Sequence, residues 1–211
     1  MTDLGPDERR ELLGVLEGAR ERGLLGPGPV ETHLDHSMAW AAALGRPPTT
    51  FLDLGSGGGV PGLVLASVWP DTRAVLLDAH QRAVAYILDA VERLGLDERV
   101  ETVADRAEAA GRDPIRREAF PLVVARGFAA PAVTAECGSA FVVPGGRLSV
   151  SEPPGSDPVR WPAAPLERLA LRWRGPIAGR GASFVVLEKT GPLDDRWPRR
   201  VGVPRRRPLW P

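Results

Sequence analysis

The feature that most constrains the fold is a glycine-rich segment, DLGSGGGVPG, at residues 53–62. It begins at the end of a short β-type run, residues 50–54, and leads into an apolar stretch, residues 63–68, that predicts a helix. Glycines allow tight turns and a close approach of the backbone to a ligand. A strand, a glycine loop and a helix in direct succession therefore predict a ligand site at the carboxyl end of a strand.

Strands and helices alternate from residue 50 to residue 150, which predicts the α/β class with a mostly parallel sheet. The later strands are predicted at residues 73–78, 100–103, 122–125 and 146–150, and a clear helix at 81–94. Two further runs, 168–173 and 183–188, have no clear helix between them and predict an antiparallel hairpin at one edge.

The chain divides into three predicted parts. Two short helices, 7–22 and 30–44, form an N-terminal helical extension over residues 1–46. The main domain covers residues 47–195, and a basic C-terminal arm covers residues 196–211.

Two acidic residues flank the glycine loop and indicate which ligand it holds. Asp78, at the end of the second strand, suits hydrogen bonds to ribose hydroxyls. Gly57, Gly59 and Gly62 match the dinucleotide fingerprint, so a nicotinamide cofactor is one alternative and a glycine turn without a ligand is another. Asp53 would repel a pyrophosphate but suits S-adenosylmethionine, which carries a sulfonium and an ammonium. The pattern is typical of the class I S-adenosylmethionine-dependent methyltransferases, which have a Rossmann-like fold.

Charge is balanced over the 211 residues but unevenly distributed. Residues 1–105 hold nine arginines against 17 acidic residues, whereas residues 106–211 hold 18 basic residues against ten acidic ones. Six arginines lie between Arg196 and Arg207, with no acidic residue among them. Such a segment predicts a polyanionic partner. Its prolines disfavour a helix, so we expect an extended arm along the edge of the sheet.

Several classes of protein are excluded or disfavoured. A single cysteine, Cys137, excludes an internal disulfide and a cysteine-rich metal site, and we expect no bound metal. No apolar run approaches the roughly 20 residues of a membrane span, and the first residues do not resemble a signal peptide. We therefore expect a cytoplasmic protein without membrane contact, and a monomer.

The glycine loop resembles that of the RsmG (GidB-type) small-subunit ribosomal RNA methyltransferases, D-x-G-S-G-x-G-x-P-G. The resemblance covers about residues 33–209 and includes their H-x-x-D-S, R-A-E and S-R-A-x-A segments and their Pro- and Arg-containing ending. These segments correspond to His33 with Ser37, residues 106–108, residues 124–129 and residues 196–209. The chain departs from the family pattern at His36, Pro121, Glu152 and Pro153.

The resemblance implies transfer of a methyl group from S-adenosylmethionine to guanine N7 of 16S ribosomal RNA. Arg126 is the expected catalytic, substrate-side residue and also contacts the cofactor. The other expected cofactor-binding residues are Asp53, Gly55, Ser56, Gly57, Gly59, Gly62, Asp78, Ala107 and Glu108. The expected RNA-binding residues are Arg199, Arg200, Arg205 and Arg206. Two alternatives stay open: a methyltransferase acting on another substrate, such as a small molecule, and a degenerate relative that binds S-adenosylmethionine or RNA without turnover.

Overall fold

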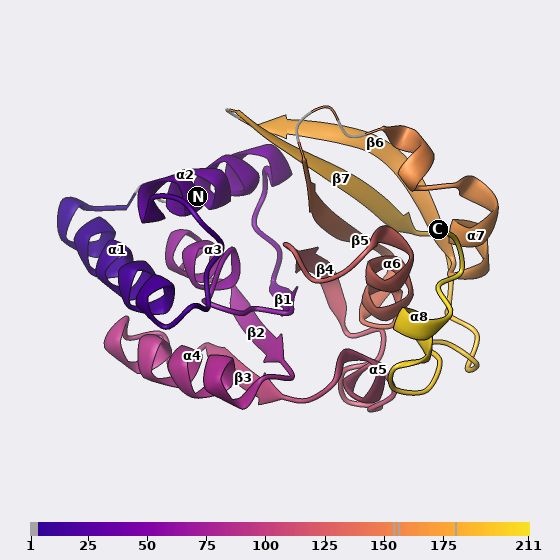
Figure 1. Cartoon of the computed structure of the whole chain (residues 1–211), viewed down its shortest axis with the longest axis horizontal. Coiled ribbons are helices and arrows are strands. Elements are labelled where there is room, and N and C mark those ends of the chain that lie inside the picture. Colours follow the sequence, from indigo (N-terminus) through magenta and orange to yellow (C-terminus); the bar gives the residue numbers. More distant parts are fainter. Residues whose placement is uncertain (1–3, 154, 156, 180) are drawn as a thin grey trace.

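A seven-stranded sheet in the order β3-β2-β1-β4-β5-β7-β6 organises the computed structural model (Figure 1), which describes residues 4–153, 155, 157–179 and 181–211. The strands are β1 (Thr50–Leu54), β2 (Arg73–Asp78), β3 (Val100–Ala104), β4 (Phe120–Ala125), β5 (Val142–Glu152), β6 (Leu171–Gly179) and β7 (Ala182–Lys189). The first five strands pair in parallel, whereas β7 pairs antiparallel with both β5 and β6. The predicted parallel sheet with an antiparallel edge hairpin is confirmed.

Helices cover both faces of this sheet. They are α1 (Pro6–Glu21), α2 (Val30–Leu44), α3 (Gly62–Val68), α4 (Gln81–Arg93), α5 (Ala107–Ala110), α6 (Pro131–Ser139), α7 (Ala163–Arg168) and α8 (Val203–Arg206), with a short 3₁₀ turn at Pro158–Arg160. Side chains of α1 to α4 form one apolar core with one face of the sheet, and those of α5 to α7 form a second core with the other face. In the part of the chain that the structure describes, none of these helices combines the length and apolar character of a membrane span.

The alternation of side chains along β1 places the first site residue. Phe51 belongs to the first core, and Leu52 and Leu54 belong to the second. Asp53 therefore points to the same face as Phe51, under the beginning of α3. The strand order reverses between β1 and β4, and at such a point the carboxyl ends of the strands leave a crevice for a ligand.

The N-terminal helices pack onto the sheet. Trp40 of α2 is fully buried, stacks on Phe184 of β7 with ring centroids 4.6 Å apart, and donates a hydrogen bond to Ser149 Oγ of β5 at 2.8 Å. On α1, Leu12 and Leu16 are fully buried in the same core. Helix α2 thus packs on the antiparallel strands β6 and β7, and α1 packs against α2.

The expectation that the C-terminal arm lies extended along the edge of the sheet is wrong. The arm lies beside α5 and α6 (Figure 1), and it contains the one-turn helix α8. Trp197 and Trp210 are buried in the second core. Arg112 and Arg117 donate hydrogen bonds to the main-chain carbonyls of all six residues from 193 to 198, at 2.6 to 3.4 Å. Neither sequence pattern nor charge predicted this attachment.

Candidate active site

The glycine loop is fixed by hydrogen bonds across the ends of β1 and β2. The N–H groups of Gly55 and Ser56 donate to the Leu77 carbonyl at 2.9 and 3.1 Å, and the Gly57 N–H donates to Asp78 Oδ2 at 2.9 Å. Gly57 and Gly59 have φ of 51° and 91°, a region that glycine adopts without strain. The loop thus keeps its shape through contacts within the protein.

Most glycines of the loop make room for protein side chains. A Cβ at Gly55 would lie 2.6 Å from the Phe128 ring, and one at Gly58 would lie 2.7 Å from the Leu25 side chain. At Gly59 it would clash with Leu63. Gly57 differs, because a Cβ there would meet the backbone oxygen of Leu24 at 3.4 Å and no side chain. Gly57 lines the cavity beside Leu24, and its φ of 51° disfavours any residue with a side chain.

Asp53 lies fully buried beneath the loop. Its Oδ2 accepts a hydrogen bond from the Gly62 N–H at 2.9 Å, which fixes the start of α3, and a side chain at Gly62 would clash with this carboxylate. Its Oδ1 has no hydrogen-bond partner among the described residues. Burial raises the pKa of Asp53 to about 7, against the lowering effect of the Gly62 N–H. A nearby cation would favour the charged carboxylate and lower this pKa again.

Asp78 lies at the cavity wall. It accepts hydrogen bonds from the Gly57 N–H and from His80, whose backbone N–H and Nδ1 lie 2.8 and 3.0 Å from Asp78 Oδ1. The carboxylate joins the glycine loop to the beginning of α4. Asp78 lines the cavity, and both of its carboxylate oxygens accept hydrogen bonds within the protein; its contact with ribose stays a prediction.

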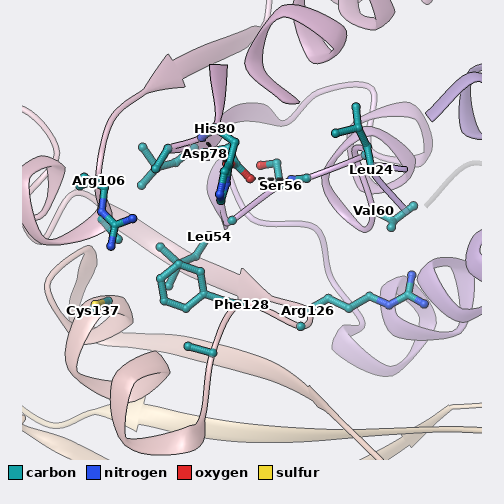
Figure 2. A pocket seen from close by; sticks show the side chains of 18 of the residues that line it. Leu24, Leu54, Ser56, Val60, Asp78, His80, Arg106, Arg126, Phe128 and Cys137 are labelled. Carbon is teal, nitrogen blue, oxygen red and sulfur yellow. Dashed lines mark hydrogen bonds and ion pairs between the residues drawn. The ribbon is translucent and has the colours of Figure 1, made fainter. Parts of the chain in front are cut away.

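A cavity of about 500 Å³ opens between these elements (Figure 2). Figure 2 shows Arg106 and Cys137 on one side of the cavity, Arg126 on the opposite side, and Phe128 between them. Burial raises the pKa of the Cys137 thiol, so this cysteine is a packed, unreactive group. The volume is in the range of small-molecule and cofactor sites.

Arg126 is positioned by a residue of the N-terminal helices. Its Nη2 donates to Nδ1 of His33 on α2 at 2.7 Å, and Nε2 of the same histidine lies 3.2 Å from the Gly26 carbonyl. Burial and the charge of Arg126 lower the pKa of His33, which keeps the ring neutral and able to accept from Arg126. Arg126 Nη1 is buried and has no partner among the described residues. The link spans 93 positions, and no local pattern predicted it.

The N-terminal helices also contribute to the cavity through the loop between α1 and α2. Leu24, Leu25 and Gly26 line it, next to the glycine loop. Residues 24–26 of the predicted N-terminal extension therefore form part of the cavity wall.

Ala107 and Glu108 both line the cavity, as expected. Glu108 is buried, and its Oε1 accepts a hydrogen bond from the Gly202 N–H at 2.8 Å. This carboxylate therefore attaches the C-terminal arm to the cavity wall, a role that the sequence did not indicate.

The four arginines expected to bind RNA have different surroundings. Arg199 forms a bidentate pair with Glu136 of α6, with Nη2 at 2.6 Å from Oε2 and Nε at 2.9 Å from Oε1. Arg200 and Arg206 are exposed. Arg205 is exposed and lines the cofactor-sized cavity. The structure thus brings Arg205 to the site and turns Arg199 inward.

The fold is that of known methyltransferases. A SAM-dependent methyltransferase from Aquifex aeolicus superposes with a TM-score of 0.58 at 16% identity, covering 82% of this chain and 96% of that one. An O-methyltransferase from Bacillus cereus in complex with SAH superposes with a TM-score of 0.57 at 16% identity, covering 84% and 90%. At these identities the likeness establishes the fold alone.

Sequence relatives are much closer. A ribosomal RNA small subunit methyltransferase G from Pelotomaculum thermopropionicum is 36% identical over 169 residues, covering 76% of this chain and 70% of the relative. One from Moorella thermoacetica is 35% identical over 185 residues, covering 84% and 77%. The GidB family model, described as rRNA small subunit methyltransferase G, matches residues 27–151, which include the glycine loop, Asp78 and Arg126. The chain therefore belongs to the GidB family of S-adenosylmethionine-dependent methyltransferases.

Proposed function

We propose that this protein transfers a methyl group from S-adenosylmethionine to N7 of a guanine in 16S ribosomal RNA. One observation carries the proposal: the cofactor-sized cavity adjoins a second cavity of about 410 Å³, and both are lined by residues 126–129. Two adjacent cavities with a common wall suit a donor and an acceptor that must meet in line. The small-subunit RNA named for the relatives supports the choice of acceptor.

The residues present fit this cofactor. When bound, S-adenosylmethionine supplies a methyl group activated by a positively charged sulfur. Asp53 lies beneath the loop, where the positive charge of the cofactor would favour the ionised carboxylate, Gly57 lines the cavity, and Asp78 would accept from ribose hydroxyls. Ala107 would border the base, and Arg126 lies where the two cavities meet. Alignment of the reacting atoms by such a site is worth up to about 7–11 kcal/mol of the barrier.

The proposed acceptor atom loses no proton when it is methylated. His33 has both ring nitrogens engaged, with Gly26 and Arg126, and its lowered pKa makes it a poor proton acceptor. Asp53 is fully buried beneath the glycine loop. Guanine N7 carries a lone pair and no hydrogen, so its methylation needs no general base.

RNA contacts are assigned to Arg200, Arg205 and Arg206, which are exposed on the arm beside the cavity. Arg199 is left out because its guanidinium is paired with buried Glu136. Substitution of Arg200 or Arg206 by glutamine removes one cation from the RNA interface. For each phosphate that is no longer neutralised, the slope of log affinity against log salt should become shallower by about 0.7–0.9. Filter binding at several salt concentrations measures this slope.

The function is tested by incubating the protein with labelled S-adenosylmethionine and 30S subunits from a strain without this gene. Mass mapping of the RNA should find one new N7-methylguanine in 16S RNA. Gly57→Val should abolish both cofactor binding and methylation. Gly95→Val is the matched control, because Gly95 also has a positive φ, of 62°, and a Cβ there meets nothing within 4 Å. Cofactor binding without any RNA methylation would refute the proposed acceptor.

A small-molecule acceptor is the second candidate. It is favoured by Glu152, an acidic residue that lines the second cavity, which we call the acceptor-side cavity. Incorporation of label into a low-molecular-weight extract, and not into 30S subunits, would support it.

We further propose that the protein acts as a cytoplasmic monomer. Light scattering at micromolar concentration tests the monomer, and fractionation of cells tests the location.

A further inference from the structure

Three residues that line the acceptor-side cavity have buried polar atoms without a hydrogen-bond partner among the described residues. These atoms are His36 Nδ1, Arg126 Nη1 and Trp161 Nε1. His36 is neutral, because burial and the charge of Arg126 lower its pKa to about 4, and its Nε2 lies 3.1 Å from Ser151 Oγ. Buried polar groups are normally hydrogen-bonded, so these atoms indicate a polar ligand.

A carboxylate forms the far wall of the same cavity. Glu152, the last residue of β5, has a side chain only 4% exposed, and its Oε2 accepts a hydrogen bond from Arg160 Nη1 at 2.5 Å. The guanidinium holds the carboxylate in place and balances its charge. Arg126, by contrast, lies at the wall that this cavity has in common with the cofactor-sized cavity. The cavity thus has a cationic donor at one wall and an anionic acceptor at another.

Among the nucleobases, guanine fits this arrangement. Its N7 and O6 accept hydrogen bonds along one edge. Its N1–H and exocyclic amino group donate side by side along another, where a carboxylate can accept both. Adenine presents an unprotonated N1 on that edge, which a carboxylate would repel. Phe128 and Trp161 line the cavity and offer ring surfaces for stacking.

We propose that this cavity receives the acceptor guanine as a single flipped-out base, and that Glu152 identifies it as guanine. Arg126 Nη1 donates to O6, which keeps N7 beside the cofactor-sized cavity, and Glu152 accepts from N1–H and the amino group. Base flipping is the general solution for chemistry on a stacked base. The inference rests on the proposed function and adds the residue that selects the base. The positive charge that methylation leaves on the guanine ring is also stabilised by this carboxylate.

The test is calorimetric binding of GMP, IMP and AMP to the protein saturated with S-adenosylhomocysteine. IMP lacks the amino group of GMP, so the wild type should bind GMP roughly 10-fold or more tightly than IMP, and AMP more weakly still. Glu152→Gln should bring GMP and IMP within about twofold of each other. Glu188→Gln is the matched control, because Glu188 pairs with Arg174 on the outer strands and does not line the cavity.

Different results refute the inference and the proposed function. Unchanged affinity of Glu152→Gln for S-adenosylhomocysteine, together with a single cooperative urea transition, establishes that the variant is folded. Equal binding of the three nucleotides by the wild type, or a guanine preference retained in folded Glu152→Gln, would overturn the role of Glu152. A guanine preference with no methylation of 30S subunits would support the cavity and refute the proposed RNA substrate.

Discussion

Replacing Arg199 with alanine would remove one half of a buried ion pair. Glu136 on α6 is 0% exposed, and it accepts hydrogen bonds from Arg199 Nε, Nη2 and backbone N–H at 2.6 to 3.1 Å. After the substitution the backbone N–H remains, but the carboxylate no longer has its cation. Unlike a surface arginine, Arg199 therefore carries a large share of the stability of the arm.

The magnitude follows from the burial of Glu136. Removing one partner of a buried pair costs about 3–5 kcal/mol, because the remaining charge is left uncompensated. This is a large part of the ~5–15 kcal/mol that holds a typical domain folded. With an m-value of about 2 kcal/mol/M, the urea midpoint should fall by about 1.5–2.5 M.

Urea unfolding monitored by tryptophan fluorescence measures this shift, since Trp197 adjoins the pair. Arg200→Ala is the matched control at an exposed neighbour and should change stability by less than about 0.5 kcal/mol. The double variant Arg199→Ala with Glu136→Gln should regain much of the loss, because the buried charge is gone. Equal midpoints for Arg199→Ala and Arg200→Ala would show that the pair does not support the fold.

Three further predictions concern the cofactor site. The folded state raises the pKa of Asp53 from 3.8 to about 7. The contribution of this group to the free energy of unfolding is therefore complete below about pH 4 and is lost as the pH rises to 7. Asp53→Asn should remove this pH dependence, of up to about 4 kcal/mol, from the stability measured by urea unfolding. Gly58→Val should lower the free energy of unfolding by about 1–3 kcal/mol through its clash with Leu25. Gly14→Val is the control, because a Cβ at Gly14 meets nothing within 4 Å, and equal melting temperatures of the two variants would contradict the prediction. Asp78→Ala should weaken cofactor binding roughly 10- to 100-fold by calorimetry, and an unchanged dissociation constant in folded protein would remove Asp78 from the site.

The sheet and the glycine loop could be predicted because their signals are local. Apolar runs and the glycines of residues 53–62 specify strand, turn and helix within a few positions of each other. Asp53 and Asp78 follow from the same pattern, since the ends of β1 and β2 lie side by side. Ends of strands in a parallel sheet meet at one edge, so neighbours in space can be inferred from order in the sequence.

The contacts that complete the site could not be predicted, because they join distant segments. His33 and Arg126 meet only after α2 packs on the sheet, and Glu108 meets Gly202 only after the arm attaches. Charged residues are usually exposed, and for this reason Arg199 was expected to bind RNA. Nothing in the sequence around Glu136 indicates that this carboxylate is fully buried and accepts Arg199.

The attachment of the arm has an evolutionary consequence. Arg112 and Arg117 hold residues 193–198 through main-chain carbonyls, which every amino acid possesses. These hydrogen bonds themselves place no selection on the side chains of that segment, where selection comes instead from the burial of Leu193 and Trp197, but they place strong selection on the two arginines. Among descendants of this sequence, the exposed positions 194–196 can drift while the path of the segment stays the same, whereas substitutions at Arg112, Arg117 or the buried Leu193 and Trp197 should be purged.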